Sequence, residues 1–127
     1  MSRAESGGAG VRALLAAAGL GTRLRPLTDR VPKCLAPIAG RPLIDYWFDR
    51  FEEAGIREVL INTHHLPEQV RAYIAEVNRR GRFRVREAYE PVLLGSAGTV
   101  AANPDLADGA ETVLIVYGDN LSGVGLR

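Results

Sequence analysis

Hydrophobic residues in this chain gather in short runs. These runs are separated by amphipathic stretches and by turns that are rich in glycine and proline. The run VRALLAAA, residues 11–18, is almost wholly apolar, which predicts a strand that is buried on both faces of a parallel sheet. TVLIVY at 112–117 is a second apolar run, and VLINT at 59–63 begins with three apolar residues; both predict strands. A weaker alternation over residues 83–89 predicts one more strand.

Helical periodicity fills the segments between these strands. Apolar side chains recur at helical spacing after Pro42, and Gly55 is suited to end that helix. Pro67 begins a second amphipathic segment that ends near Gly81, and a short helix is expected over residues 96–102. The alternation predicts an α/β fold with a Rossmann-like, mainly parallel sheet, right-handed crossovers and helices on both faces.

The loop after the first predicted strand carries glycines and arginines in the order GLGTRLRPLT, residues 19–28. Glycine lets the backbone approach a ligand closely, and successive N–H groups after a strand can point at phosphate oxygens. Arg23 or Arg25 supplies a guanidinium group, and Lys33 adds a compact charge. The GxG pattern alone equally fits a tight turn. A dinucleotide-binding turn would need a third glycine where Leu24 stands, and no GK[ST] follows for a Walker A loop.

Two more segments come directly after predicted strands, at the carboxyl edge where sheets of this kind bind ligands. Residues 90–98, EPVLLGSAG, contain a glycine-rich turn into a helix that can lie against a base. Gly118 and Asp119 follow the last strand, where a carboxylate can bind a hard cation together with phosphate oxygens. Taken singly, both segments also fit a plain loop and an ordinary strand-end aspartate.

A longer stretch decides between these alternatives. LAAAGLGTRLRPLTDRVPKCLAPIAGRPLI, residues 15–44, closely resembles the opening signature of the sugar-phosphate nucleotidyltransferase family, the NDP-sugar pyrophosphorylases, and the LGSAG and GD segments follow in the family's order. The resemblance implies an enzyme that joins a sugar 1-phosphate and a nucleoside triphosphate to give an NDP-sugar and pyrophosphate. It implies that residues 11–127 are the nucleotide-binding N-terminal part of such a domain, and residues 1–10 read as a flexible leader.

The family's motifs assign roles to the matching residues. By resemblance, Arg23 and Lys33 are catalytic cations, which would stabilise the charge that develops on the leaving pyrophosphate. Asp119 is implied as a ligand of the catalytic Mg²⁺. The implied nucleotide contacts are Gly19, Gly21, Thr22, Gly95, Ser96 and Gly98. Glu90 is a weaker candidate for such a contact.

Composition narrows the range of partners. Sixteen basic and fifteen acidic side chains leave a formal charge of +1, so no bulk field favours nucleic acid or an anionic membrane. No window is long and apolar enough for a membrane span, and the first ten residues lack a signal-peptide core. The lone Cys34 offers no disulfide and is expected to be structural. His64 and His65 are expected to be strand-end residues, since no acidic or cysteine partner stands at ligand spacing. We expect a cytoplasmic protein with small-molecule substrates.

The chain ends ten residues after its last predicted strand, whereas family members continue with strands that bind the sugar and supply a second acidic metal ligand. Two functions therefore stay open. One is a nucleotidyltransferase that is complete only with its missing half. The other is a catalytically silent nucleotide-binding or regulatory module, or an inactive fragment, on the same fold. Exposed sheet edges favour self-association, so a homo-oligomer is an expected outcome. The choice of nucleotide and sugar stays open.

Overall fold

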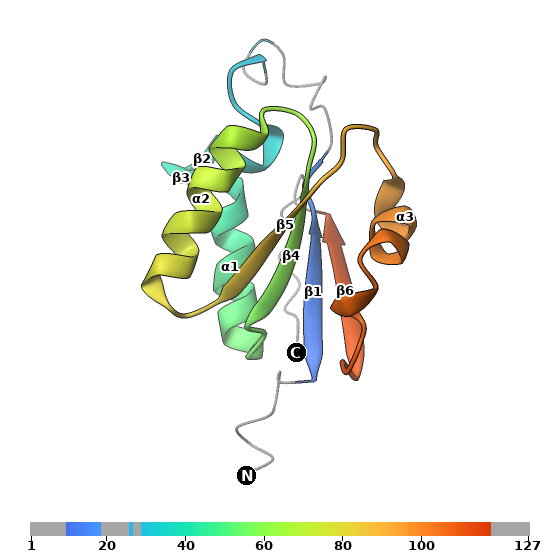
Figure 1. Ribbon diagram of the computed structural model, residues 1–127. Coiled ribbons are helices and arrows are strands. Elements are labelled where there is room, and N and C mark those ends of the chain that lie inside the picture. Colours follow the sequence, from blue (N-terminus) through green and yellow to red (C-terminus); the bar gives the residue numbers. More distant parts are fainter. Residues whose placement is uncertain (1–9, 19–25, 27–28, 118–127) are drawn as a thin grey trace.

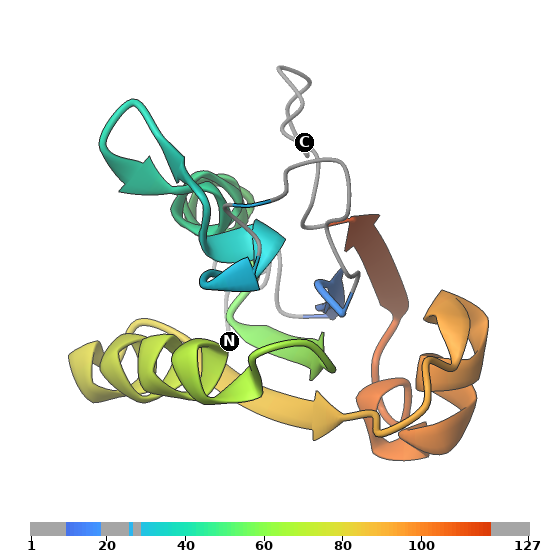
Figure 2. The same cartoon turned by 90° about the horizontal axis from the view of Figure 1, so that it is seen from above.

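A computed structural model describes residues 10–18, 26 and 29–117. Within these residues, four parallel strands pair in the order β5-β4-β1-β6; they are β1 (Val11–Ala16), β4 (Glu58–Thr63), β5 (Arg84–Tyr89) and β6 (Thr112–Tyr117). The helices are α1 (Leu43–Ala54), α2 (Pro67–Arg80) and α3 (Gly95–Ala102). Helices α1 and α2 cover one face of the sheet and α3 lies on the other (Figures 1 and 2). The predicted α/β class is confirmed.

Shorter elements connect these layers. The segment after the first loop contains the 3-10 helix η3 (Lys33–Leu35) and a hairpin of β2 (Pro37–Ile38) and β3 (Arg41–Pro42). A second 3-10 helix, η4 (Pro104–Leu106), follows α3. The sequence had indicated only a loop before Pro42. None of the helices in the described ranges has the length and apolar content that a membrane crossing requires.

The main core lies between the sheet and helices α1 and α2. Side chains of β1 and β4 alternate between the two faces, and the odd-numbered residues Ala13, Leu15, Val59 and Ile61 point into this core. Helix α1 adds Trp47, Phe48 and Phe51 at helical spacing, and Phe48 packs edge-on against Phe51 with ring centroids 5.5 Å apart. The apolar periodicity seen in the sequence is thus the buried face of α1.

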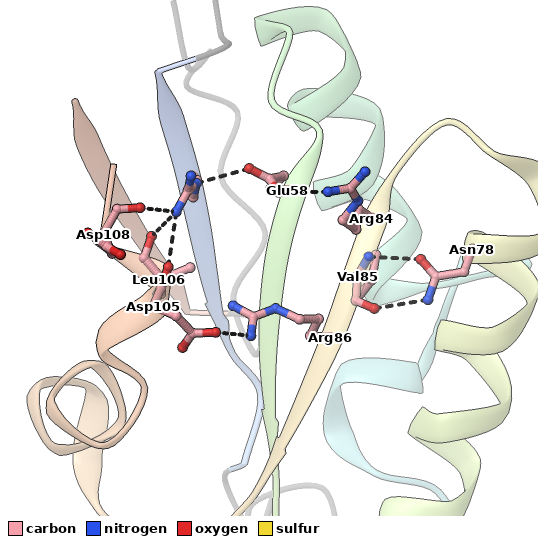
Figure 3. A network of polar contacts seen from close by, with 9 residues as sticks. Glu58, Asn78, Arg84, Val85, Arg86, Asp105, Leu106 and Asp108 are labelled. Carbon is pink, nitrogen blue, oxygen red and sulfur yellow. Dashed lines mark hydrogen bonds and ion pairs between the residues drawn. The ribbon is translucent and has the colours of Figure 1, made fainter. Parts of the chain in front are cut away.

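A smaller core on the other face consists of Leu14, Leu60 and Leu106. Arg12 of β1 joins this face of the sheet to η4 through Asp105, Leu106 and Asp108, which are labelled in Figure 3. The guanidinium group donates to three backbone carbonyls at the end of η4, those of Asp105, Leu106 and Asp108, at 3.0, 3.1 and 2.6 Å. Its Nε lies 2.9 Å from the Glu58 carboxylate. Arg12 therefore satisfies carbonyls that the end of a short helix leaves without partners.

Candidate functional site at the carboxyl edge of the sheet

The parallel strands direct their carboxyl ends to one edge of the sheet, and the predicted nucleotide-binding segments begin there (Figure 1). Seen from above, η3 and α3 stand at this edge on opposite faces of the sheet, with the end of β1 between them (Figure 2). Lys33 begins η3, and Gly95 begins α3. The fold thus places two of the predicted segments around the end of the central strand.

The remaining predicted site residues are Gly19, Gly21, Thr22, Arg23 and Asp119. They lie outside the described residues, so their roles stay predictions. The structure does describe the residues that lead into both segments. Ala17 and Ala18 come before the first loop, and Tyr117 ends β6 just before Gly118. These residues fix where both segments start.

Lys33 is held at the edge by its neighbour in η3. Cys34 is buried in the main core, and η3 packs against α1. Burial raises the pKa of the Cys34 thiol from 9.0 to about 12, because desolvation disfavours the thiolate. Cys34 therefore anchors the turn and is not a nucleophile, as the sequence indicated. Lys33 itself is half-buried and is not without an interaction partner.

The two glycines of α3 differ in what their missing side chains allow. Gly95 has a φ of +75°, a left-handed conformation that other residues adopt only with strain, and a Cβ there would meet no atom within 4 Å. Gly98 has helical geometry, and its Cβ would lie 3.0 Å from the Cβ of Leu94. The space beside Gly95 is thus open to a ligand. Contact with Leu94 is the structural reason for Gly98.

Ser96 links α3 to the end of β6. Its hydroxyl lies 3.3 Å from the Tyr117 hydroxyl; Ser96 is half-buried and Tyr117 is exposed. Large apolar side chains also face solvent here, with exposed fractions of 71% for Val92, 46% for Leu93, 47% for Leu94 and 54% for Tyr117. Exposed apolar side chains gathered at one place mark a binding surface. This surface, which we call the α3 entrance (Val92, Leu93, Leu94, Ser96 and Tyr117), can pack against a planar base.

A buried polar network lies beneath the α3 entrance. Asn62, at the carboxyl end of β4, accepts hydrogen bonds from the backbone N–H groups of Ala17 and Ala18 and donates to Thr99. The Thr99 hydroxyl also contacts Glu90. Sequence reasoning missed Asn62 and Thr99. A polar residue within the apolar run 59–63 was the available signal, because a buried amide needs partners.

Glu90 serves this network and is not a surface ligand. Glu90 is 2% exposed. One of its carboxylate oxygens contacts the Thr99 hydroxyl, and the other accepts a hydrogen bond from the backbone N–H of Leu94 at 3.3 Å. Its backbone carbonyl lies 2.6 Å from Nδ1 of His64. Glu90 was the weaker candidate for a nucleotide contact, and its carboxylate is buried and bonded within the chain. His64 holds the loop after β5.

No group of three or more histidine, cysteine, aspartate or glutamate side chains in the described ranges is arranged to hold a metal ion. A hollow on the surface between α1 and α2 is lined by charged pairs that include Arg41 with Asp45. It contains none of the predicted site residues. The carboxyl edge of the sheet is therefore the candidate site.

A parallel sheet with a glycine-initiated helix, a cationic turn and an open apolar surface at its carboxyl edge defines an α/β ligand-binding domain of the doubly wound type. The family model described as Nucleotidyl transferase matches residues 12–127. The chain belongs to this family.

Individual relatives agree with this assignment. N-acetylmuramate alpha-1-phosphate uridylyltransferase of Neisseria meningitidis is 37% identical over 117 residues, which is 90% of this chain and 49% of that protein. Mannose-1-phosphate guanylyltransferase 1 of Arabidopsis thaliana is 30% identical over 92% of this chain and 33% of its own length. The structure of CTP:phosphocholine cytidylyltransferase from Streptococcus pneumoniae superposes with a TM-score of 0.73 and 28% identity, covering 92% of this chain and 48% of that one. The chain thus spans about half the length of these relatives or less.

Proposed function

We propose that this chain is the nucleotide-binding part of a nucleotidyltransferase that joins a sugar 1-phosphate and a nucleoside triphosphate and releases pyrophosphate. One observation carries the proposal. The α3 entrance, the turn that carries Lys33 and the end of β1 meet at one edge of the sheet, in a chain whose family match runs over residues 12–127. A triphosphate lying there would have cationic groups on one side and an apolar surface for its base on the other.

The reaction is an in-line displacement. An oxygen of the sugar phosphate attacks the α-phosphorus, a new P–O bond forms, and the bond to the bridging oxygen of pyrophosphate breaks. Charge builds up on the leaving pyrophosphate, and Arg23 and Lys33 would stabilise it. Gly19, Gly21 and Thr22 would contact the triphosphate, and Gly95 and Ser96 the base side. These roles follow from the family's motifs and from the placement of Lys33 and α3.

Magnesium is part of this proposal. Asp119 comes two residues after β6, and a carboxylate at that edge has the oxygen donors that a hard cation prefers. Glu90 does not fit as a second ligand, because both of its oxygens are already bonded within the chain. Phosphate oxygens and water would complete the coordination. When bound, Mg²⁺ supplies positive charge that polarises the α-phosphate.

The relatives suggest which substrates to test first. We propose UTP with N-acetylmuramic acid 1-phosphate as the first pair, since the uridylyltransferase of Neisseria meningitidis is 37% identical to this chain. GTP with mannose 1-phosphate and CTP with phosphocholine follow, after the other two relatives. We place the protein in the cytoplasm and expect no nucleic-acid or membrane partner, because its charge is nearly balanced.

The alternative is a catalytically silent nucleotide-binding or regulatory module on the same fold. Pyrophosphate release from each substrate pair with Mg²⁺ separates the two functions. If the chain is active on its own, we expect pyrophosphate release, and a rate at least about 100-fold lower for Asp119→Ala, because the charge of a bound metal stabilises the transition state by several kcal/mol.

Glu53→Ala is the matched control, since Glu53 is an exposed carboxylate on α1. It should leave the rate unchanged. Binding of UTP without pyrophosphate release from any pair would favour the silent module or an inactive fragment of the transferase. An equal rate for Asp119→Ala and the unaltered chain would contradict the assigned metal ligand.

A further inference from the structure

We infer that Asn62, Thr99 and Glu90 form a positioning relay that holds the end of β1 and the start of α3 in one fixed geometry and thereby sets nucleotide affinity. The inference rests on the proposed function and names residues that do not touch the substrate. Its three side chains are at most 4% exposed. Asn62 lies near the end of β4, Glu90 directly follows β5, and Thr99 belongs to α3.

The first step of the relay lies where β1 ends. The parallel pairing of β1 with β4 ends at Ala16 and Asn62, so the next two N–H groups lie beyond the ladder. Asn62 Oδ1 accepts from Ala17 N at 2.6 Å and from Ala18 N at 3.2 Å. Both alanines are buried, and unpaired backbone N–H groups there would be costly. Asn62 thus fixes the backbone immediately before Gly19.

The second step runs from β4 to α3. Asn62 Nδ2 donates to Thr99 Oγ1 at 3.3 Å, which fixes the orientation of the amide, because the oxygen must face the alanines. Thr99 is fully buried. Its hydroxyl also lies 2.9 Å from the Gly95 carbonyl oxygen, one turn earlier in α3. The same side chain therefore contacts both the amide that holds β1 and the first residue of α3.

The third step closes on the loop before α3. The Thr99 hydroxyl contacts one carboxylate oxygen of Glu90, and the other oxygen accepts from Leu94 N at 3.3 Å. Leu94 belongs to the α3 entrance and stands directly before Gly95. The relay thus ends on backbone at both sides, at Ala17 and Ala18 and at Leu94 and Gly95. Every buried side-chain nitrogen and oxygen in the described ranges has a partner.

Pairing the N–H groups of Ala17 and Ala18 accounts for Asn62 but not for the buried hydroxyl of Thr99 beside it. Apolar side chains of the same volume fill such a space at no desolvation cost, whereas a buried polar network is favourable only when every member is bonded. What the network adds is directional geometry between two backbone segments. Those two segments lead into the glycines predicted to bind the triphosphate and the base. A shift at Thr99 should therefore reach the backbone of Ala17 and Ala18 without any contact between them.

Amide hydrogen exchange in the ligand-free chain tests this coupling. Thr99→Val keeps the shape and removes the hydroxyl, and Thr99→Ser keeps the hydroxyl. In Thr99→Val we expect the amides of Ala17 and Ala18 to exchange about tenfold faster than in the unaltered chain, measured relative to core amides such as that of Leu14. The reason is that the side-chain amide of Asn62, which accepts from both, becomes free to rotate. Thr99→Ser should restore the slow exchange. Val100→Ala, which loosens α3 on the smaller core, should change all amides alike.

Titration with UTP tests the functional part. We expect Thr99→Val to raise the Kd about tenfold and Thr99→Ser to stay within about twofold of the unaltered chain. If Thr99→Val does not fold, Glu90→Gln removes the charge while keeping the shape, and it should give the same pattern. Exchange at Ala17 and Ala18 that follows the core amides in both variants would overturn the relay.

The remaining outcomes separate the relay from the proposed function. Selective exchange with an unchanged Kd would show that the coupling exists but overturn its effect on affinity. If the unaltered chain binds no UTP or other nucleoside triphosphate, the proposed function fails, and the affinity claim fails with it. The exchange measurement would still decide whether Asn62 and Thr99 couple the two segments.

Discussion

Single buried residues carry much of what is specific to this site. Asn62 and Glu90 are buried and would be costly without partners. In each, one oxygen accepts from backbone N–H groups of the carboxyl edge, and the other polar atom bonds to the Thr99 hydroxyl. Gly95 has the backbone conformation that glycine alone adopts without strain, and the space beside it is open. At this scale the site consists of fixed backbone rather than of many side chains that reach toward a ligand.

The reactivity of Cys34 tests how well the turn around Lys33 excludes solvent. Because the folded pKa of about 12 lies above the ordinary value of 9.0, the thiolate at pH 8 is roughly a thousandfold scarcer than in the unfolded chain. We expect iodoacetamide to label the native protein more slowly than the urea-unfolded protein by at least that factor. The protonated thiol adds stability that is intact below pH 9.0 and lost as the pH rises toward about 12. Equal labelling rates would show that η3 opens readily.

The family resemblance implied roles for Lys33, Gly95 and Ser96. The structure places all three at the carboxyl edge of the sheet, and their roles stay predictions. The bond from Asn62 to Thr99 spans 37 positions and joins a strand to a helix on the other face of the sheet. No local pattern encodes such a pairing, since it depends on how α3 packs. Likewise, nothing in the sequence around Glu90 indicates that its carboxylate is buried.

Among the elements, the cover formed by α3 and η4 depends on Arg12. We expect Arg12→Met to lower the free energy of unfolding by about 2 kcal/mol, because three carbonyls lose a charged donor in a partly buried place. Arg84→Met is the matched control, since the Arg84 side chain is 81% exposed and lies 3.6 Å from the same Glu58. It should change stability by less than about 0.5 kcal/mol. Urea unfolding measures the free energy of unfolding of both variants. Similar decreases for Arg12→Met and Arg84→Met would contradict this role of Arg12.

Elements of the sheet were predictable to within one or two residues because their apolar runs are long. The strand at 112–117 matches β6, and the helix after Pro42 ends before Gly55 as expected. The hairpin of β2 and β3 was missed, since two-residue strands have no periodicity. Its turn uses Ala39 and Gly40, with φ values of 51° and 81°. A non-glycine residue in that conformation is not expected from sequence.

At the scale of the whole molecule, the two outer strands of the sheet, β5 and β6, differ in charge. The outer strand β5 carries Arg84 and Arg86, and charged side chains on an edge strand discourage pairing with another chain. β6 has the sequence TVLIVY with no charge, and within the described residues no strand pairs with its outer edge. Ile115 and Tyr117 of β6 are exposed. One edge is therefore protected and the other is suited to pairing.

This asymmetry predicts concentration-dependent self-association through β6. We expect the sedimentation coefficient of the chain to rise with concentration, and Ile115→Lys to raise the dimer Kd by about tenfold or more, because a lysine on the strand must be desolvated when a second strand pairs. Ile38→Lys is the matched control: Ile38 is 43% exposed, against 38% for Ile115, but lies on β2, away from the four-stranded sheet. Association that Ile38→Lys weakens as much as Ile115→Lys would point to general hydrophobic contact. A sedimentation coefficient that does not change with concentration would show that the edge of β6 does not pair between chains.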